Sequence, residues 1–528
     1  MPMKSQKVLL AILVGSGLLL LFSATLAGIW THQSLNQAKS FQLAEASDKA
    51  DQALMVVRPL SLMTLRLLPD IEIWRQALTL ISESEQIVTT LDSFSAENVD
   101  PLTTLPLKPL VTQLTQVSDR LTQMETDCQR SLIAKVIIEC HQLTAADQFV
   151  DDWLVVGNWL TEEDPTVIVL FQNTEELRAT GGFMGSYAKV QFANGNISHL
   201  LIEDIYEPDG QFTGYVEPPA GVREYLSSGK GMRLPDANWQ VDFPSAAQTI
   251  LNYFALGNEQ SIDGVIAINS DLVEKLLTVT GDIYLPDYGM TVTSANFTAL
   301  ARADRDQFFP GSQQKTNFLE HFFNVLKFKL TQLNQEQQLQ LAMILRDSFI
   351  DKTIQLYSTQ TDVQQIYEKY AVAGSLTSSP GMMYLVESNV GINKANKDIQ
   401  RSVELNIAPF KVDMHVKINA TDLPYINYQR LIINPLWSIE SIEVNGQRLE
   451  TWDEEVITNS HGHEFRQIGF LVTVPTNSST GITIVIDTTN QPATDFPLQI
   501  LKQPGLPPTP YTIITEEGTE SFILEKDI

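Results

Sequence analysis

The chain has 528 residues, too many for one hydrophobic core, so two to four domains are expected. Its composition, 43% hydrophobic and 19% charged residues, excludes wholesale disorder. The 63 acidic and 35 basic residues give a net charge of −28, which disfavours nucleic acid as a partner because that binding depends on cations that neutralise phosphates. Any phosphate ligand therefore needs a local cationic pocket.

The N-terminal segment predicts a membrane anchor. Lys4 and Lys7 lie in residues 1–7, and the 23 residues that follow, 8–30, contain no charge. A helix of that length spans roughly 30 Å of hydrocarbon. The basic residues predict that 1–7 is a cytoplasmic tail, that 8–30 is a single transmembrane helix in the plasma membrane, and that the bulk of the chain is extracytoplasmic. A cleaved signal peptide is the alternative, although its apolar region is normally shorter, about 7–15 residues.

Residues 31–160 are expected to form a helical stalk or bundle. Apolar residues recur there at spacings of three and four, in runs that prolines separate; the first run is expected to end near Pro59. The runs contain Leu43, Ala46, Ala50, Ala53 and Val57, then Ile71, Trp74, Leu78 and Ile81, then Leu110, Leu114, Val117 and Leu121. Each apolar stripe needs a partner; an antiparallel bundle or hairpin is the simplest solution, and a homotypic coiled coil is the alternative.

The two cysteines, Cys128 and Cys140, lie twelve residues apart in this helical region. On one straight helix they would be about 18 Å apart, too far for a disulfide unless the chain turns between them. The spacing therefore favours two buried free thiols, and a metal pair that includes His141 is the alternative.

Residues 161–370 alternate strand-like and helical runs, the pattern of an α/β sheet covered by helices. Strands are expected at Thr166–Phe171, Tyr187–Phe192, Ile197–Ile205 and Gly264–Ile268, and helices at Ser245–Leu256, Ser270–Val279 and Gln314–Gln335. Asn194-Gly195 is the expected turn of a hairpin. A further helical run is expected from Glu336 to about Glu368.

Several motifs of this domain resemble a known family. They are Gln172–Phe183 (QNTEELRATGGF), Asp236-Ala-Asn-Trp239 with Asp242-Phe-Pro244, Asp263–Ile268, Asn389–Asn396 with Arg401, and Lys502-Gln-Pro-Gly505. Together they resemble the bacterial membrane-anchored proteins of the domain of unknown function 4012 family. The resemblance covers nearly all of the predicted extracytoplasmic chain, but it implies no activity.

A more distant resemblance is to the LytR-CpsA-Psr phosphotransferases, which move glycopolymers from a polyprenyl diphosphate carrier onto the cell wall. Leu256–Ile268, Leu300–Arg305 and Gln313–Asn317 carry it. It implies a LytR-CpsA-Psr-like α/β domain in which Arg302, Arg305 and Lys315 surround a diphosphate, a task that suits such cations.

The chain departs from that pattern at two places. Gly185-Ser-Tyr187 stands where those enzymes carry an acidic metal ligand, and Asp204–Asp209 stands where they carry an arginine. Asp204 and Asp209 are then the candidate ligands for Mg²⁺, and the cofactor is otherwise unknown. Part of the usual site is missing, so it stays open whether the protein is an enzyme.

Two polar loops supply further candidates. Arg178 is either an anion-binding arginine at a strand end, where open α/β sheets bind ligands, or an arginine paired with the neighbouring glutamates. The second loop, Asp236, Asn238, Trp239 and Asp242, combines carboxylates with an indole, as sugar binding or acid–base chemistry would require. Capping of a turn and of the following helix is the favoured alternative for this loop.

Residues 371–500 are expected to form an Ig-like β-sandwich and 501–528 a Pro-rich, acidic tail that is packed only in part. Strands are expected at Val403–Ile407, Val412–Ile418, Tyr428–Ile433, Ile439–Val444, Phe470–Val474 and Ile482–Ile486. The sequence thus predicts an α+β multidomain protein.

Two functional hypotheses follow. The first is an envelope protein that binds, and as an enzyme would transfer, a polyprenyl-diphosphate-linked glycan or wall glycopolymer in a cleft containing Arg178, Arg302, Arg305 and Lys315. The second is a non-catalytic envelope scaffold or adhesion protein that acts through its stalk and sandwich.

Overall fold

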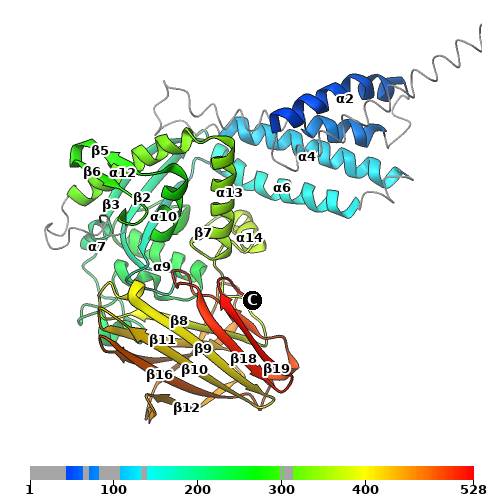
Figure 1. The fold of residues 1–528 in the computed structure, drawn as a ribbon. Helices are drawn as coiled ribbons and strands as arrows, with labels where there is room; N and C mark the ends of the chain where they lie inside the picture. The colour runs from blue at the N-terminus through cyan, green and yellow to red at the C-terminus, as the bar shows by residue number, and fades with distance from the viewer. Residues whose placement is uncertain (1–42, 64–70, 82–106, 132–139, 298–299, 301–312) are drawn as a thin grey trace, which may run out of the picture. The chain divides into compact units, whose positions relative to one another are not determined.

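The computed structural model describes residues 43–63, 71–81, 107–131, 140–297, 300 and 313–528 (Figure 1). The chain divides into two compact units. The first contains the described residues up to Asp164 together with 192–197, and the second contains 165–191 and the described residues from 198 onward.

The first unit is helical. Its helices are α2 (Leu43–Met63), a helix over 71–81, α4 (Leu107–Arg130) and α6 (Cys140–Glu162). The α2 residues that pack against Leu78 of the second helix are small or aliphatic and fully buried: Ala50, Ala53, Leu54 and Val57. The apolar stripe is therefore a packing face, as its spacing predicts, although α2 continues past Pro59 to Met63.

Helices α4 and α6 run antiparallel. The Thr122 hydroxyl donates to Asp147 Oδ2 at 2.7 Å, and the Ser118 hydroxyl, one turn earlier on α4, donates to Asp151 Oδ1 at 2.5 Å, one turn later on α6. These polar contacts join the facing helices, and the first of them satisfies the buried carboxylate of Asp147.

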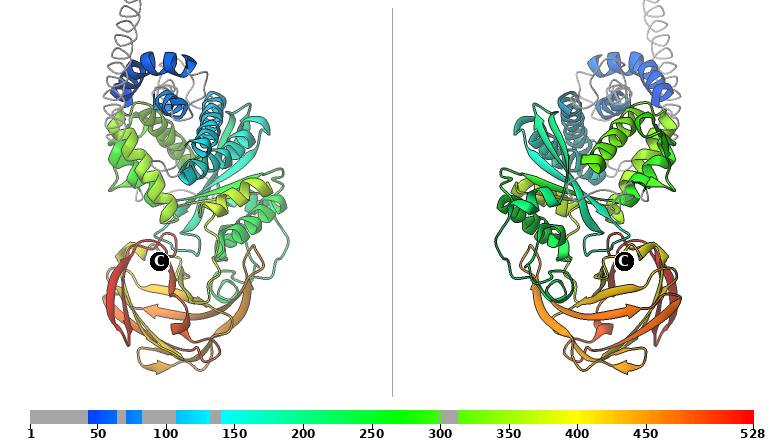
Figure 2. Two further views of the ribbon diagram at one scale, coloured as in Figure 1. Left: turned by 90° about the vertical axis from the view of Figure 1, so that its right-hand side faces the viewer. Right: turned by 90° about the vertical axis from the view of Figure 1, so that its left-hand side faces the viewer.

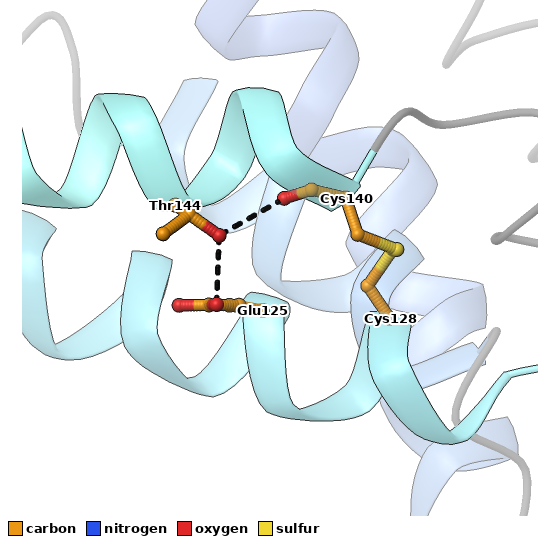
Figure 3. Close-up of a disulfide and its surroundings, with 4 residues drawn as sticks. All are labelled: Glu125, Cys128, Cys140 and Thr144. Carbon is orange, nitrogen blue, oxygen red and sulfur yellow. Dashed lines mark hydrogen bonds between the residues drawn. A yellow bond between two sulfur atoms is a disulfide. The ribbon is translucent and has the colours of Figure 1, made fainter.

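A disulfide joins Cys128 to Cys140 at the end of this helix pair, with their Cα atoms 5.9 Å apart (Figure 3). Beside it, Thr144 Oγ1 donates to Glu125 Oε1 at 2.7 Å and so adds a second contact between the helices. The prediction of two free thiols is wrong, and so is the metal alternative. Because α4 ends at Arg130 and α6 begins at Cys140, the cysteines lie on two helices instead of one.

The predicted transmembrane helix, residues 8–30, lies outside the described residues. Among the helices of the described part, none is long and apolar enough to cross a membrane. For the described residues, the fold class is corrected to α+β with several sheets, and no spanning helix is among their elements.

The second unit begins with a five-stranded sheet in the order β3-β2-β1-β4-β7. The strands are β1 (Thr166–Asn173), β2 (Phe183–Ala193), β3 (Asn196–Asp204), β4 (Gly264–Asn269) and β7 (Ile354–Ser358). β1 and β4 are parallel, whereas β2 and β7 run antiparallel to their neighbours β1 and β4. The predicted hairpin is confirmed, because Asn194 and Gly195 adopt positive φ angles of 53° and 77° between β2 and β3.

Helices cover both faces of this sheet. They and the short helices around them are α7 (Tyr206–Gln211), α8 (Val222–Tyr225), η2 (Leu234–Trp239), α9 (Phe243–Leu256), α10 (Ser270–Thr280), α12 (Gln313–Thr331), α13 (Gln335–Ile350) and α14 (Thr361–Lys369). Phe254 and Ile250 of α9 share a core with Leu170 of β1, while the next residue of β1, Phe171, stacks on Phe323 of α12 at 5.0 Å. Beside α12 lies the short hairpin of β5 (Ile283–Leu285) and β6 (Met290–Val292).

The predicted continuous helix over 336–368 is wrong. The chain turns after α13, where Lys352 has a positive φ of 61°, and then forms β7, which is buried throughout. Burial on both sides removes the alternation of apolar and polar residues by which an exposed strand is recognised.

The rest of the chain forms a sandwich of two sheets (Figure 2). The first has the order β13-β12-β16-β10-β9-β18-β19 and the second β14-β15-β11-β8-β17. Their strands are β8 (Met382–Asn389), β9 (Ile399–Ala408), β10 (Lys411–Ala420), β11 (Tyr425–Ile433), β12 (Ser438–Val444), β13 (Gln447–Arg448), β14 (Asp453–Thr458), β15 (Glu464–Val474), β16 (Ser478–Asp487), β17 (Gln499–Leu501), β18 (Thr509–Thr515) and β19 (Gly518–Leu524).

The sandwich differs from the expected one in two respects. The six predicted strands are present, but β17 runs parallel to β8 and β18 parallel to β9, and further strands are added, so the sandwich is larger than the seven-stranded antiparallel Ig-like arrangement. The predicted tail 501–528 is not a loosely packed appendage, because it supplies β18 and β19 of the first sheet.

Strands β8 and β11 of the five-stranded sheet of the sandwich are buried on both faces. Along β8 and β11, Leu385 and Leu431 face the other sheet of the sandwich, whereas Val386 and Ile432 pack with Ala179 of the α/β region. The second unit is therefore continuous from the α/β sheet to the outer sheet of the sandwich, and polar residues at this junction must be satisfied internally.

Candidate functional site

The loop after β1 is enclosed, and every residue from Thr174 to Gly182 is buried. It starts where β1 and the parallel β4 end side by side, an edge at which ligands commonly bind in open α/β sheets. Here the protein's own backbone fills that edge. A Cβ on Gly505 would lie 2.2 Å from the carbonyl oxygen of Gly181, so these two backbones are in direct contact.

The Gly181-Gly182 turn has a structural reason. Gln172 Oε1 accepts from the Thr180 hydroxyl at 3.1 Å and from the Gly182 amide at 3.0 Å. Asn238 Nδ2 donates to the Thr180 hydroxyl at 3.0 Å and to the Gly182 carbonyl at 2.8 Å. Gly181 has a φ of +133°, a backbone angle that residues other than glycine rarely adopt. The turn is therefore held by side-chain amides and is not a cradle for phosphate.

Arg178 is only 1% exposed and is neutralised by this chain. Its Nη2 donates to Glu176 Oε1 at 3.1 Å and to Asp236 Oδ1 at 3.4 Å, and its Nη1 donates to the carbonyl of Asn389 at 2.6 Å. Burial raises the pKa of Asp236, and the positive charge of Arg178 opposes that rise. The paired-arginine alternative is therefore correct for Arg178, with partners from distant segments as well as from its own loop.

Asp242 is a helix cap. Its Oδ2 accepts from the Ser245 amide at 3.2 Å at the start of α9 and from the Ser460 amide at 3.0 Å, while its Oδ1 accepts from the Leu376 amide at 2.8 Å. The capping alternative is correct here. The same carboxylate also ties α9 to two loops of the sandwich.

Trp239 and Arg430 form a buried stack at the junction. The Arg430 guanidinium lies 4.4 Å from the centre of the Trp239 ring, and its Nη1 donates to the Trp239 carbonyl at 2.8 Å. Burial lowers the pKa of Arg430 to about 10. The indole is 3% exposed, so it is not a platform for a sugar.

A second buried ion pair lies inside the sandwich. Arg401 donates from Nε to Glu387 Oε1 at 2.7 Å and from Nη2 to Glu387 Oε2 at 2.8 Å, and Tyr425 donates to the same Oε2 at 2.7 Å. Burial acts to lower the pKa of Arg401, but the charge interactions and hydrogen bonds with Glu387 and Tyr425 together outweigh burial and raise it. The pair lines a small cavity with room for about one water molecule.

Two amides connect this ion pair to the loop after β1. Gln503 Nε2 donates to the carbonyls of Glu387 at 2.8 Å and Arg178 at 2.9 Å. Asn396 Oδ1 accepts from Arg401 at 2.6 Å, and Asn396 Nδ2 donates to the Thr174 carbonyl at 2.7 Å. We refer to the connected residues as the polar seam, which consists of Thr174, Arg178, Asp236, Glu387, Asn396, Arg401 and Gln503; Asn238 lies beside it in the Gly181-Gly182 turn.

Lys502, next to the seam, is also buried at 6% exposure. Its Nζ donates to the Gln503 carbonyl at 3.2 Å, and burial lowers its pKa to about 8. Lys502, Gln503 and Asn396 belong to motifs that the family resemblance marks. Glu387 and Tyr425 carry no such signal, because a lone glutamate and a lone tyrosine in strands are ordinary residues.

The remaining predicted cations are not described. Arg302 and Arg305 lie outside the described residues, and Lys315 lies in α12 where its side chain is outside them. A cleft that joins these three to Arg178 therefore stays a prediction. Arg178, whose side chain is described, faces carboxylates inside the protein.

The predicted Mg²⁺ ligands have structural roles. Asp209 accepts from Arg233 Nε at 3.1 Å and from the Leu234 amide at 2.9 Å, while Asp204 Oδ1 accepts from the Tyr206 amide at 3.1 Å at the start of α7. Across the described ranges no group of three or more histidine, cysteine and acidic side chains is placed to hold a metal ion. Asp209 thus binds a guanidinium in the position proposed for a metal.

The comparison with known families agrees with the first resemblance. Residues 162–305 match the model of a family described as "Protein of unknown function (DUF4012)". The similarity to the DUF4012 family is therefore shown for this part of the chain. No curated protein matches the chain. The match does not extend to the more distant resemblance, so a LytR-CpsA-Psr-like fold is unconfirmed.

The structure shows that two segments outside residues 162–305 contact the region that matches the family. The motifs at Asn389–Asn396 and Lys502–Gly505 lie outside the DUF4012 match, yet their side chains bind the first DUF4012 motif in the polar seam. The family's motif and the sandwich are thus parts of one packed interface.

Proposed function

We propose that the protein is a non-catalytic structural protein of the cell envelope that acts outside the cytoplasm, with the DUF4012 region and the sandwich as one packed body. One observation carries this proposal: the charged residues of the motifs contact one another inside the protein. Arg178 is neutralised by Glu176 and Asp236, and Arg401 is neutralised by Glu387. Each of Arg178, Glu176, Glu387 and Arg401 is 9% exposed or less.

Catalysis requires reacting groups that a substrate can reach. Buried arginines with satisfied carboxylate partners act instead as fixed contacts that hold a unique arrangement of layers. The envelope glycopolymer hypothesis differs on this point, because it needs Arg178 to meet a diphosphate together with Arg302, Arg305 and Lys315.

The disulfide supports a location outside the cytoplasm. Disulfides persist in oxidising compartments and are rare where thioredoxin and glutathione keep thiols reduced. Cys128 and Cys140 bridge α4 and α6 at a point where the cross-link closes a short loop, so it stabilises the helix pair by about 3 kcal/mol.

A titration with farnesyl diphosphate, a soluble polyprenyl diphosphate, separates the two hypotheses. Isothermal calorimetry on the full chain should detect no saturable binding, and the R302A/R305A variant should behave like the wild type. Saturable binding that is lost in R302A/R305A, while its melting temperature is unchanged, would overturn the proposal in favour of the glycopolymer site.

The location is tested by labelling thiols in intact cells before and after reduction. We expect no labelling of Cys128 and Cys140 until the protein is denatured and reduced, with the C128S/C140S variant as the unlabelled control. Two labelled thiols in the unreduced, denatured protein would contradict the extracytoplasmic assignment.

A further inference from the structure

A long surface segment follows α7 and contains little regular structure. Between the end of α7 at Gln211 and the start of η2 at Leu234, the only helix is the single turn α8. Two contacts close the segment: the ion pair of Arg233 with Asp209, and the Met232 amide, which donates to the Val216 carbonyl at 2.9 Å. Long ordered loops of this kind commonly carry a binding function.

The middle of the segment is fixed against the sandwich. A Cβ on Gly221, which has a φ of +82°, would lie 2.6 Å from the Trp239 ring and 2.8 Å from the Tyr428 ring. Figure 2 shows the segment, in green, beside the edge of the sandwich. The segment therefore presents its outer residues from a defined position.

Those outer residues include two tyrosines. Tyr215 is 61% exposed and Tyr225 is 38% exposed. The Tyr225 ring lies 6.1 Å from the ring of the buried Tyr428, so it is supported from behind. Exposed aromatic rings held in place by a rigid scaffold lose little conformational entropy on binding.

Charged groups connect the two rings. The Tyr215 hydroxyl donates to Glu217 at 2.9 Å, and Glu217 lies 3.8 Å from the guanidinium of Arg223. Arg223 Nε in turn donates to Glu224 Oε1 at 2.7 Å. All of these side chains are at least 36% exposed. Both oxygens of Glu224 already have partners within the patch segment, because its Oε2 accepts from the Gly221 amide at 2.7 Å.

Asp453 completes the set from the sandwich. Its Oδ2 accepts from the Tyr428 hydroxyl at 2.6 Å, directly behind Tyr225, and its charge acts on Arg223. We refer to Tyr215, Glu217, Arg223, Glu224, Tyr225 and Asp453 as the tyrosine patch.

The charge of the patch selects the class of ligand. One arginine stands against three carboxylates, a net charge of −2, which repels phosphate and other polyanions. The negative face of an aromatic ring attracts the C–H groups on one side of a pyranose ring, while carboxylates and a guanidinium hydrogen-bond its hydroxyls. We propose that the tyrosine patch binds a neutral saccharide by stacking on Tyr215 and Tyr225. This site is separate from the polar seam and goes beyond the proposed function.

The test uses the full chain and neutral hexasaccharides, namely chitohexaose, cellohexaose and maltohexaose, with polygalacturonate as the anionic probe. We expect at least one neutral probe to bind saturably in a calorimetric or NMR titration and polygalacturonate not to bind. Y215A and Y225A should each weaken the binding at least tenfold, and R223M should weaken it several-fold. Y215F and Y225F, which keep the rings, should retain most of it.

Tyr284 supplies the matched control, because it is 59% exposed on β5 and lies outside the patch. Y284A should bind like the wild type. Failure of all three neutral probes to bind, or equal binding by Y215A, Y225A and the wild type at equal melting temperatures, would overturn the inference. These outcomes are independent of the farnesyl diphosphate titration, so either proposal can fail alone.

Discussion

The polar seam and the tyrosine patch are built from the same kinds of side chain but differ in burial. In the seam, Arg401 meets Glu387 and Tyr425 with almost no exposure to water; in the patch, Arg223 meets Glu217 and Glu224 at the surface. An ion pair in a low-dielectric interior leaves a costly unpaired charge when one partner is removed, whereas an exposed pair is screened and contributes little. The comparison teaches that burial, more than residue type, decides whether an arginine–carboxylate–tyrosine group is structural or available to a ligand.

The same substitution in both regions gives the largest expected contrast. R401M leaves Glu387 buried without its partner and should lower the free energy of unfolding by about 3–5 kcal/mol. R223M should leave it unchanged within error, because water replaces the lost contacts of an exposed side chain. Guanidinium denaturation followed by circular dichroism measures both.

A second variant keeps this test informative if R401M does not fold. The double variant E387L/R401M removes both charges, and it should recover most of the lost stability. Equal destabilisation by R401M and R223M would remove the distinction between the two regions.

Lys502 provides a pH-dependent contrast. Its pKa is lowered from 10.5 to about 8 by burial, so the unfolded chain binds more protons than the folded one between those values. The contribution of Lys502 to stability should therefore rise with pH from about 8 to 10.5, by about 3 kcal/mol at most. Below about pH 8 Lys502 is protonated in both the folded and the unfolded state, so the full cost of burying its charge lowers the stability.

K502M should abolish this rise, and the exposed control K230M should keep it. Urea unfolding at several pH values, with the wild type measured in parallel, gives the difference. A wild type and K502M with parallel pH profiles would show that Lys502 is not buried as a charged group next to the seam.

Two glycines test the close approach of backbones at the seam. Gly446 and Gly505 have almost the same φ, 74° and 72°, but a Cβ on Gly446 meets nothing within 4 Å, whereas one on Gly505 meets the Gly181 carbonyl. G446A should cost about 1 kcal/mol from backbone strain alone. G505A should cost about 2 kcal/mol more, because the added methyl group has no space. Equal melting temperatures for the two variants would contradict the close contact of Gly505 with the first motif.

Local patterns predicted the elements whose residues alternate or recur in one simple period. The helices of the first unit, the β2–β3 hairpin with its Asn194-Gly195 turn, and six strands of the sandwich follow from such patterns. The sequence does not predict β7, because that strand is buried on both faces and shows no alternation of apolar and polar residues. It does not predict β18 and β19, because their stretch is proline-rich and acidic and forms sheet only by pairing with β9.

The candidate residues show the same limit. The family motifs identified Arg178, Asp236, Asn238, Asn396, Arg401 and the Lys502–Gly505 segment, which all lie in or beside the seam. Their role was not predicted, because a polar motif has the same sequence whether it lines a cleft or an interior contact. The disulfide was missed for a related reason: the spacing of Cys128 and Cys140 excludes a bridge only on a continuous helix.

By itself the sequence determined the similarity of residues 162–305 to the DUF4012 family, the mixed α+β class and the periodic elements, since each depends on residues that are near one another along the chain. Only the tertiary structure decided that the motifs of the α/β region and the sandwich meet, that Arg178 and Arg401 are enclosed while Arg223 is exposed, and that the two cysteines are bridged. The physical reason is that burial and pairing are properties of segments that pack together, in one case 325 residues apart, and no local pattern records which segments will do so.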